Sequence, residues 1–329
     1  MSSQSANENR RDGPQEILLF FFFTLDVQPQ CFKIGDHDEV GTYVNSCREC
    51  EYCDDGLKAY CSNGAVFTFD NIDADGSITD GGYSTYIIVL LQNTRELPTS
   101  PGSTFAMRWN YCLLSHDAPK DEPASKSLGE IGLGGLGHLA VKFGKSFGLK
   151  VTVFSTNISK KDKALNLLGA DKFVVSSDKQ QMAALAKSLD FILNTASADI
   201  PFNPYLSVVK TAGVLALVEF PSEVKFGPAS FNRGMKTVSG SLTGDTKETQ
   251  EMLDFCASSK IYPEIEFVPI QYANGALERM IKRDVKYWFV IDIENSLKRH
   301  GCRRKKGFEF WQFILEHVDI CNWRTFILF

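Results

Sequence analysis

The chain has 329 residues, of which 43% are hydrophobic and 23% are charged, and these fractions are ordinary for a globular protein of about two domains. With 35 basic and 40 acidic residues, its net charge is −5. That balance argues against a general nucleic-acid-binding protein, which would usually present a basic face. We therefore expect no nucleic-acid partner.

An apolar run near the N-terminus, from Ile17 to Phe23, is the first segment that could suggest a membrane. The run is too short to span a bilayer, which takes about 20 residues. Asp12 and Glu16 precede it, whereas a signal peptide would carry positive charge there. A membrane-surface anchor is the third interpretation, and it is disfavoured because no helical polar face accompanies the run. We expect no membrane partner and a cytoplasmic location, which the odd number of nine cysteines also favours.

Four cysteines with the spacing C-x2-C-x2-C-x7-C predict a structural zinc site. They are Cys47, Cys50, Cys53 and Cys61. Four thiolates on one short loop can close a tetrahedron around zinc and leave no open coordination position. The loop is polar and has no apolar period, so it has little reason to be ordered without a metal. The alternative is a pair of disulfides in a secreted protein, and the absence of a recognisable secretion signal argues against it.

A glycine-rich motif with the spacing G-x-G-x-x-G follows later in the chain. It consists of Gly132, Leu133, Gly134, Gly135, Leu136 and Gly137. A short apolar strand precedes it, a helix is predicted over 138–147, and a second strand is predicted over 151–154. In such a βαβ unit Gly132 would permit the tight turn, Gly134 would let the backbone approach a pyrophosphate, and Gly137 would let the helix sit close to the strand. Free N–H groups at the helix start would hold the phosphates, so the motif predicts a dinucleotide site, with a ligand-free turn as the alternative.

The same pattern of strand and helix continues beyond this unit. Apolar runs that predict strands lie at 173–175, 191–193 and 214–218, and they alternate with helix-compatible stretches at 159–168, 180–188 and 246–258. Alternating strands and helices are typical of an α/β fold with a doubly wound parallel sheet, the Rossmann arrangement.

The residues after the second strand indicate which dinucleotide would bind. An NAD site usually has Asp or Glu there for the ribose 2′-hydroxyl. Here the predicted contacts are Ser155, Thr156, Ser159 and Lys160, and Lys161 follows. Hydroxyls and ammonium groups suit a 2′-phosphate, which a carboxylate would repel, so NADP is favoured over NAD. The alternative is that Lys160 and Lys161 merely begin a solvated helix.

Several long segments carry a resemblance to a known family. They are 40–47 (Val-Gly-Thr-Tyr-Val-Asn-Ser-Cys), 81–84 (Gly-Gly-Tyr-Ser) and 126–298 almost throughout, and the first nine residues also match. In these segments the chain resembles the zinc-dependent medium-chain alcohol dehydrogenases, and within them the plant cinnamyl alcohol dehydrogenases and their mannitol-dehydrogenase-like relatives. The resemblance covers roughly three quarters of the chain.

The resemblance implies a β-rich GroES-like catalytic domain that is split around the Rossmann domain. The implied divisions are a divergent, disordered segment at 1–31, an incomplete GroES-like domain at 32–125 with the zinc loop at 47–61, an NADP-binding Rossmann domain at 126–260, a return segment of the catalytic domain at 261–298, and a divergent tail at 299–329. Relatives form dimers through the nucleotide domain, so a homodimer is implied as well.

The resemblance also implies an activity and further cleft residues. The family reduces cinnamaldehydes to cinnamyl alcohols with NADPH in the phenylpropanoid pathway that leads to lignin, and zinc acts as a Lewis acid on the carbonyl oxygen. The implied partner is therefore a small-molecule aldehyde or alcohol. The residues that would line the cofactor cleft are Thr195, Glu219, Leu242, Thr243 and Gly244.

The chain departs from the family at the catalytic zinc. The family holds this zinc with an early Cys-Gly-x-Cys-His segment, a Gly-His-Glu segment and a later Cys-Ala-Gly stretch, and the first two are absent here. Met107 stands where the third ligand is expected, and reading the implied codons of 107–115 one nucleotide later recovers Cys-Ala-Gly-Ile-Thr-Val-Tyr-Ser. We interpret 90–124 as containing a frameshifted stretch, and methionine is a poor zinc ligand. Cys31 and His37 are the only nearby candidates, but His37 lies in a segment that resembles a family loop without a metal-binding role, and Cys31 is interpreted as a surface substitution. The sequence thus predicts a structural zinc, no catalytic zinc and no catalytic residue.

Two point differences add to this departure. Glu130 lies in the first Rossmann strand, where relatives have an apolar residue, and a buried carboxylate there costs free energy or shifts its pKa. Glu219 replaces a glycine beside the nicotinamide region and should weaken cofactor binding. Two readings remain open: an impaired NADP-dependent zinc alcohol dehydrogenase, or a non-enzymatic remnant that retains structural zinc and dinucleotide binding. A four-cysteine module of a regulatory protein is disfavoured, because such a module needs no dinucleotide domain.

Overall fold

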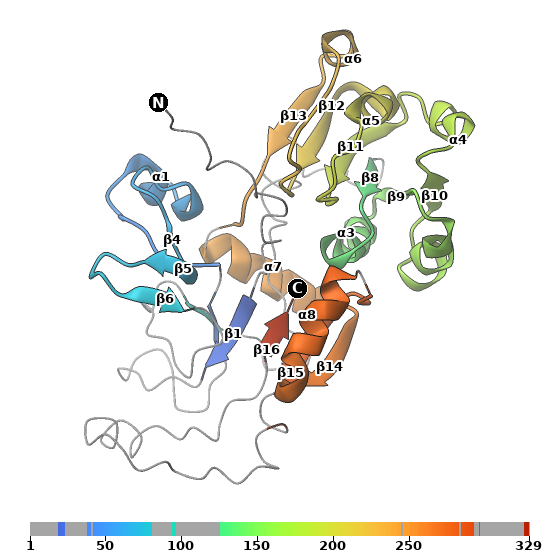
Figure 1. Ribbon diagram of the computed structural model, residues 1–329. Coiled ribbons are helices and arrows are strands. Elements are labelled where there is room, and N and C mark those ends of the chain that lie inside the picture. The colour runs from blue at the N-terminus through green and yellow to red at the C-terminus, as the bar shows by residue number, and fades with distance from the viewer. Residues whose placement is uncertain are drawn as a thin grey trace, which may run out of the picture.

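The computed structural model describes residues 42–80, 126–244, 246–282, 284–292 and Ser296, together with the backbone of four short strands outside these ranges. Figure 1 shows the arrangement of these elements, with the sheet of β8 to β13 at the upper right and the four-cysteine loop around α1 at the left.

A six-stranded parallel sheet forms the centre of the part that begins at residue 126. Its strands, in spatial order, are β10 (Lys172–Val175), β9 (Lys150–Ser155), β8 (Ser127–Ile131), β11 (Leu189–Asn194), β12 (Val209–Leu217) and β13 (Thr237–Gly240). All neighbouring strands pair in parallel. Numbered along the chain, the spatial order is 3-2-1-4-5-6, so the predicted doubly wound α/β fold is confirmed. The order reverses between β8 and β11, and sheets of this kind bind ligands at the carboxyl ends of the strands at such a point.

Helices cover both faces of this sheet and enclose two apolar clusters. On one face α3 (Gly135–Ser146) and α7 (Thr246–Ser259) pack against Leu128, Val151 and Val153. On the other face α4 (Lys179–Ala183) and α5 (Phe202–Val208) pack against Phe154 and Ile192, and α6 (Pro228–Asn232) lies beside α5. Adjacent residues of one strand, such as Val153 and Phe154, therefore enter different clusters, as the alternation of side chains in a strand requires.

Two of the predicted helices differ from the structure. Instead of one helix over 159–168 there is a 3₁₀ turn, η5 (Ile158–Lys160), and then a π-helical turn, η6 (Lys163–Leu167). The helix expected over 180–188 is the shorter α4, which the Asp178 side chain caps by accepting hydrogen bonds from the N–H groups of Gln180 and Gln181. Both segments offer only short apolar faces to the sheet, so tertiary packing sets their length rather than helix propensity.

The zinc loop lies in a small β-rich region with little apolar material of its own. Strand β3 (Tyr43–Asn45) pairs antiparallel with β4 (Val66–Phe67), and the loop between them contains α1 (Glu51–Asp54) and η1 (Lys58–Tyr60). A hairpin of β5 (Phe69–Ile72) and β6 (Ile78–Asp80) follows.

A second, mixed sheet brings segments from across the chain together. Its spatial order is β14 (Ile265–Pro269), β15 (Trp288–Asp292), β16 (Phe326–Leu328), β1 (Leu19–Phe23), β2 (Asp38–Val40) and β7 (Thr94–Glu96). The turn η7 (Ile270–Tyr272) and the helix α8 (Ala273–Ile281) lie between β14 and β15. Val44 of β3 shares a cluster with Val268, Ala276, Phe289 and Ile291, so the segment after residue 260 packs with the zinc-loop region rather than with the parallel sheet alone.

The backbone of Leu19–Phe23 corrects one expectation. These residues form β1 and pair with both β2 and β16, so the prediction of disorder over 1–31 is wrong for them. A run of Leu and Phe residues has high strand propensity, and a neighbouring strand edge offers it backbone partners. Residues 326–328 of the divergent tail likewise form a strand, β16.

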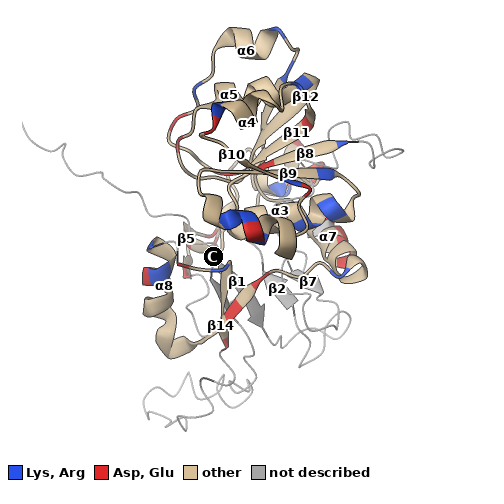
Figure 2. Ribbon diagram, turned by 90° about the vertical axis from the view of Figure 1, so that its right-hand side faces the viewer, with Lys and Arg blue, Asp and Glu red and all other residues tan. Residues whose placement is uncertain are grey.

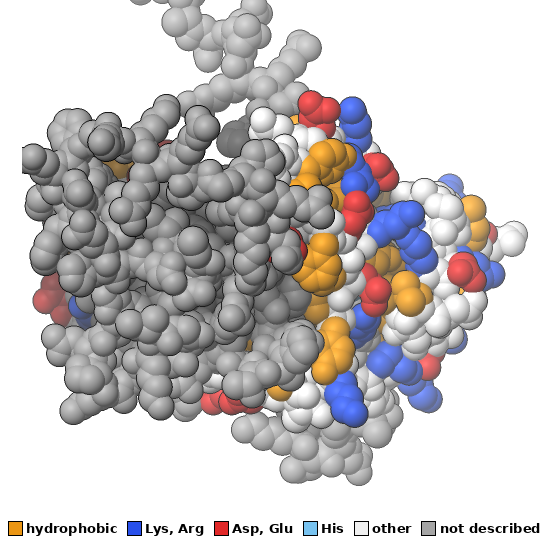
Figure 3. All heavy atoms as spheres, turned by 90° about the horizontal axis from the view of Figure 1, so that it is seen from below, with side chains coloured by type: hydrophobic (Ala, Val, Ile, Leu, Met, Phe, Trp, Pro, Cys, Tyr) orange, Lys and Arg blue, Asp and Glu red, His pale blue; other side chains and the backbone are white. Residues whose placement is uncertain are grey.

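The described surface carries charges of both signs. Basic and acidic residues are interspersed over the ribbon in Figure 2, and apolar side chains lie among charged ones in the view of Figure 3. No helix in the described part of the chain has the length and apolar character that a membrane crossing needs.

Candidate cofactor and zinc sites

The glycine loop between β8 and α3 is shaped by three glycines with different surroundings. Gly132 has φ +104°, and a Cβ there would lie 2.7 Å from the backbone nitrogen of Ala196. A Cβ on Gly137 would collide with the carbonyl oxygen of Gly132 and lie 2.6 Å from Glu130 Oε1. A Cβ on Gly134 would have its nearest neighbour at 3.8 Å. The loop is thus closed on its inner side and open over Gly134, which is the shape that a bound pyrophosphate requires.

The start of α3 offers free backbone donors beside this opening. No side chain of a described residue caps the helix at Gly134, and the first N–H bonded back into the helix is that of His138, to Gly134 O at 3.1 Å. A helix start with unpaired N–H groups attracts anions. On its inner side the loop packs closely against an indole, because a Cβ on Gly135 would lie 2.6 Å from Trp288 Nε1.

Thr195 follows β11 and joins the glycine loop from the neighbouring strand. Its N–H donates to Ile131 O at 2.8 Å, and its hydroxyl lies 2.7 Å from Gly132 O and 2.6 Å from Glu130 Oε1. Glu130 is fully buried, and this burial raises the pKa of its carboxyl well above the ordinary value. The expected cost of a carboxyl group in this strand therefore takes the form of a shifted pKa.

Among the residues that follow β9, Lys160 contacts the same loop. The Lys160 ammonium donates to Leu133 O at 2.8 Å, while the Asn157 side chain accepts from the N–H of Ser159 at 2.9 Å. Ser155 is half-buried, and Thr156 and Ser159 are exposed. The alternative interpretation, in which the two lysines merely begin a solvated helix, fits Lys161, which is exposed. It does not fit Lys160, which donates a hydrogen bond to the glycine loop.

The other predicted cleft residues also follow the carboxyl ends of strands. Glu219 comes after β12, where its carboxylate accepts a hydrogen bond from Ser197 Oγ at 3.1 Å. Leu242, Thr243 and Gly244 come after β13 and are partly exposed. Because all these strands are parallel, the predicted residues gather at one edge of the sheet.

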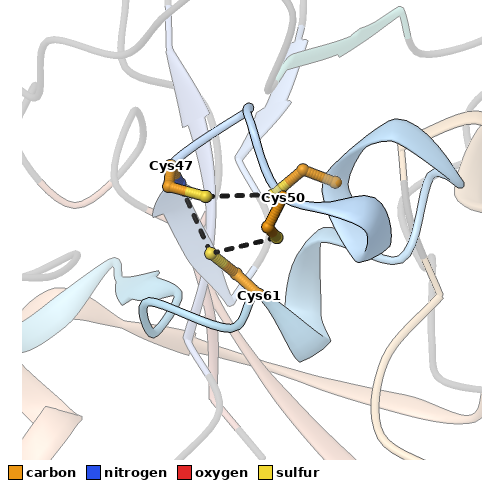
Figure 4. Close-up of side chains that lie close together, drawn as sticks. Cys47, Cys50 and Cys61 are labelled. Atoms are coloured by element: carbon orange, nitrogen blue, oxygen red, sulfur yellow. Dashed lines mark hydrogen bonds between the residues drawn. The ribbon is translucent and has the colours of Figure 1, made fainter.

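The four cysteines converge on one point, as Figure 4 shows for three of them. Their sulfur atoms all lie within 4.8 Å of one another, with 3.9 Å between Cys47 and Cys53 and 4.0 Å between Cys50 and Cys61. Four thiolates in a tetrahedron around zinc, with bonds near 2.3 Å, would stand about 3.8 Å apart. The donor set and its spacing therefore fit a closed Cys₄ zinc site.

Local backbone geometry places each of these sulfurs. Cys47 follows β3, Cys50 and Cys53 belong to the start of α1, and Cys61 ends η1. A backbone hydrogen bond from Ser62 is the main cause that lowers the pKa of the Cys50 thiol to about 6, whereas burial raises the pKa of Cys61 to about 11. Zinc binding requires all four cysteines as thiolates. Burial disfavours the Cys61 thiolate, and the positive charge of a bound zinc ion would stabilise it.

Comparisons with known proteins agree with this geometry. A family model described as zinc-binding dehydrogenase matches residues 135–258. A probable cinnamyl alcohol dehydrogenase from Oryza sativa subsp. japonica is 54% identical over 274 residues, which cover 81% of this chain and 76% of that protein. The chain belongs to the cinnamyl alcohol dehydrogenase family of zinc-binding dehydrogenases.

Solved structures of this family have the same fold. A cinnamyl alcohol dehydrogenase from Sorghum bicolor is 36% identical with a TM-score of 0.73, over 84% of this chain and 79% of that one. The enzyme from Helicobacter pylori, complexed with NADP(H), is 32% identical with a TM-score of 0.69, over 81% and 78%. These comparisons confirm the resemblance to cinnamyl alcohol dehydrogenases that the sequence predicted. They also confirm that the family is one of zinc-binding oxidoreductases.

The segments that should hold the family's catalytic zinc fall outside the described residues. Met107, Cys31 and His37 all lie there, as does most of 90–124. Within the described ranges, the four cysteines of the loop are the one group of three or more metal-ligating side chains whose donor atoms come together. Cys256, on α7, is buried and stands apart from them.

Two residues that build the site were not predicted from the sequence. His138 is buried, with Nδ1 3.1 Å from Gly134 O and Nε2 accepting from the N–H of Glu264 at 3.1 Å, and burial is the main cause that lowers its pKa to about 4. The Tyr60 hydroxyl accepts from the N–H of Leu242 at 2.7 Å and so joins the zinc loop to the cleft segment. The position of His138 four residues after Gly134 could have indicated its contact with Gly134 O. Nothing in the sequence indicates the contact between Tyr60 and Leu242.

Proposed function

We propose that this chain is an NADP(H)-binding member of the cinnamyl alcohol dehydrogenase family that holds one structural zinc and reduces cinnamaldehydes poorly or not at all. The pyrophosphate would lie over Gly132–Gly137, and the 2′-phosphate would contact Ser155, Thr156, Ser159 and Lys160. The zinc ligands would be Cys47, Cys50, Cys53 and Cys61.

The observation that carries NADP(H) binding is the position of Lys160 against an open glycine loop. Its ammonium reaches Leu133 O at 2.8 Å, so a cation stands beside the loop where a carboxylate would select NAD. Ser155 and Thr156 follow β9 and add hydroxyl donors without negative charge. The NADP(H) complex of the Helicobacter pylori relative supports the same choice.

The chain's own residues would bind and orient the cofactor in distinct ways. The uncapped N–H groups at the start of α3 would hold the pyrophosphate, and Thr195 would fix the shape of the loop through Gly132 O. Bound NADPH would supply the hydride in the family reaction. Glu219 would place negative charge near the nicotinamide, which lowers cofactor affinity rather than abolishing it.

The proposed loss of activity rests on the sequence. Its 329 residues contain neither a Cys-Gly-x-Cys-His nor a Gly-His-Glu segment, and Met107 stands in place of the third expected cysteine. Without those ligands a carbonyl oxygen would lack the Lewis acid that the family uses. Any remaining activity would be on small aldehydes or alcohols of the cinnamyl type.

The domain division follows the same reasoning. We propose that 32–125 and 261–298 form one incomplete catalytic domain around the nucleotide domain at 126–260, and that two copies associate as a homodimer. Val44 packs in one cluster with Val268, Phe289 and Ile291, and this supports the joining of the two outer segments.

Cofactor titration and metal analysis test the proposal. NADPH should bind more tightly than NADH, and Lys160→Ala should weaken NADPH binding about tenfold, the loss of one charge-assisted contact to phosphate. Lys161→Ala, which removes an exposed neighbouring cation, should change affinity little. Equal affinity for both cofactors, or an equal effect of the two substitutions, would contradict the choice of NADP.

Activity and zinc content decide the remaining part. We expect one zinc per chain and negligible reduction of coniferaldehyde with NADPH, measured against an active family member purified in the same way. Two zincs per chain together with chelator-sensitive turnover at the rate of that reference enzyme would show that the catalytic centre is intact.

A further inference from the structure

A buried carboxyl group lies directly beneath the glycine loop. Glu130 is the fourth residue of β8, and its side chain has no exposed surface. Its Oε1 lies 2.6 Å from Thr195 Oγ1, and its Oε2 has no hydrogen-bond partner among the described residues. Gly137 makes room for this group, because a Cβ there would lie 2.6 Å from Oε1.

Counting hydrogens at Thr195 shows a conflict. Its hydroxyl carries one hydrogen, yet three oxygens lie within bonding distance: Glu130 Oε1 at 2.6 Å, Gly132 O at 2.7 Å and Ile131 O at 3.1 Å. Ile131 O already accepts from the Thr195 N–H at 2.8 Å. The hydroxyl hydrogen can therefore serve either Glu130 or Gly132, but not both.

A proton on Glu130 resolves the conflict. The protonated carboxyl donates to Thr195 Oγ1, and the Thr195 hydroxyl is then free to donate to Gly132 O. An ionised Glu130 can only accept, so it draws the Thr195 hydrogen to itself and leaves Gly132 O without this bond. The protonation of one side chain thus decides whether Thr195 holds the glycine loop.

The surroundings favour the protonated form. Burial raises the pKa of Glu130 well above its ordinary value, and the bond from Thr195 opposes this only in part. Strands β9 and β11 flank Glu130, and α3 and the 195–200 loop adjoin it; the titratable groups on these elements are His138, Lys142, Lys145, Lys150, Asp190 and Asp199. Described partners engage most of them elsewhere: Lys142 pairs with Glu264, Lys145 with Asp171, and Asp190 with Lys210. None of the six bonds to Glu130, and the start of α3, which favours negative charge, has no N–H bonded to either of its oxygens among the described residues.

We infer that Glu130 is a positioning residue that acts as a neutral acid: its proton directs the Thr195 hydroxyl onto Gly132 O, and the dinucleotide cradle keeps its shape only while that proton is present. Cofactor affinity then falls as Glu130 ionises at alkaline pH. This consequence rests on the proposed NADP(H) binding, whereas the protonation state itself does not.

Infrared spectroscopy of the whole ligand-free chain tests the protonation state. At neutral pH the wild type should show the carbonyl band of a buried carboxylic acid, and Glu130→Gln should lack it. Glu130→Gln keeps the size of the side chain and can still donate to Thr195. Absence of that band in the folded wild type at neutral pH would overturn the inference.

NADPH titrations across pH test the consequence. The wild type should lose about fivefold in affinity as the band disappears, the worth of one ordinary hydrogen bond, whereas Glu130→Gln should show no such loss. Thr195→Val should weaken binding at neutral pH, and adding Glu130→Gln to Thr195→Val should leave the pH profile of binding unchanged, because the hydroxyl that responds to the proton is gone. Identical pH profiles for wild type and Glu130→Gln would overturn the proposed role of the proton.

A ligand-free readout separates this inference from the proposed function. The thermal stability of Glu130→Gln should gain on that of the wild type as pH rises, because only the wild type must keep a proton buried. If neither protein binds NADPH but the infrared band and this stability difference are present, the proposed function fails and the protonated Glu130 stands. If the stability difference does not change with pH, the protonation inference fails, whatever the cofactor does.

Discussion

The zinc loop and the parallel sheet are held together in opposite ways. Between residues 42 and 80 the buried apolar side chains are Val44, Cys53 and Cys61, and two of these three are zinc-ligand candidates. The parallel sheet instead has an apolar cluster on each face, with helices over both. One region would depend on a metal for its order, and the other depends on burial of apolar surface.

This contrast explains why the two regions respond to sequence change differently. A loop held by four ligands is sensitive at four positions and tolerant elsewhere. In a sheet held by many packed side chains, the stability comes from many residues, and each cavity made in the core lowers the free energy of unfolding. The predictions below separate the two regions, starting with the largest expected effect.

Removal of a zinc ligand should abolish order in the loop and spare the sheet. Structural zinc contributes on the order of 10 kcal/mol to the folding of small zinc domains. Cys61→Ser should therefore eliminate bound zinc and leave the amides of 46–64 exchanging freely, while amides of β8 and β11 stay protected. Metal analysis and hydrogen exchange measure both effects.

Cys256→Ser is the matched control for this change. Cys256 is also a buried cysteine, but it lies on α7 outside the ligand cluster. The Cys256→Ser variant should keep one zinc per chain. If Cys61→Ser retained its zinc, or if the sheet opened together with the loop, the two regions would not be independent.

A cavity in the sheet should have the converse effect. Leu206 on α5 is fully buried, and Leu206→Ala should lower the free energy of unfolding of the parallel-sheet region by about 2–5 kcal/mol while zinc content stays unchanged. Denaturant unfolding and metal analysis on the same sample measure this. Leu167→Ala, at an exposed leucine, should change stability by less than about 0.5 kcal/mol. A loss of zinc in Leu206→Ala would contradict the separation of the regions.

Acid should weaken the sheet region through His138. Its pKa falls from 6.5 to about 4 on folding, so the folded state holds this ring neutral. The stabilising effect is complete above pH 6.5 and is lost as pH falls toward 4, because the unfolded chain takes up the proton first; the difference amounts to roughly 3 kcal/mol. Urea unfolding of the parallel-sheet region at several pH values measures this dependence of stability on pH.

His138→Phe provides the comparison for this slope. It should be less stable than the wild type at neutral pH, since Gly134 O and the Glu264 N–H lose a partner. Its stability should also vary less between pH 6.5 and 4. A slope as steep as that of the wild type would assign the acid sensitivity to other groups, such as the zinc thiolates.

The sequence predicted the sheet better than its covering helices. Apolar runs predicted every strand of the parallel sheet except β13, because parallel strands are buried on both faces, whereas β13 has the sequence Thr-Val-Ser-Gly and shows no apolar run. The beginning of β12 was missed, since Lys210 and Thr211 interrupt its apolar pattern. The stretch after β9 was predicted as one helix, but it forms separate 3₁₀ and π turns whose limits depend on packing against the sheet.

The candidate sites divide along the same line. The zinc ligands lie close together in the chain, so their spacing alone predicts the cluster that the structure forms. Contacts such as Lys160 with Leu133 O, or Tyr60 with Leu242, join residues 27 and 182 positions apart. Only the tertiary fold brings such residues together, and local patterns do not encode it.

The smallest expected effect is at the junction of the two regions. Tyr60 lies on η1 beside the zinc loop, and its hydroxyl accepts from the N–H of Leu242, in the segment proposed to line the cofactor cleft. Tyr60→Phe removes this one partly exposed bond, worth about 0.5 kcal/mol. Zinc content should stay unchanged and the stability of each region should fall by no more than this amount, while the Leu242 amide loses protection and NADPH affinity falls by about twofold at most. Tyr52→Phe, on α1 of the same loop and similarly exposed, should leave that amide protected.

Chelation of zinc from the wild type should reproduce the effect of Tyr60→Phe at Leu242, because a disordered loop cannot hold the hydroxyl in place. If chelation leaves the Leu242 amide as protected as before, the zinc does not support the cleft, and the two regions are independent even where they touch.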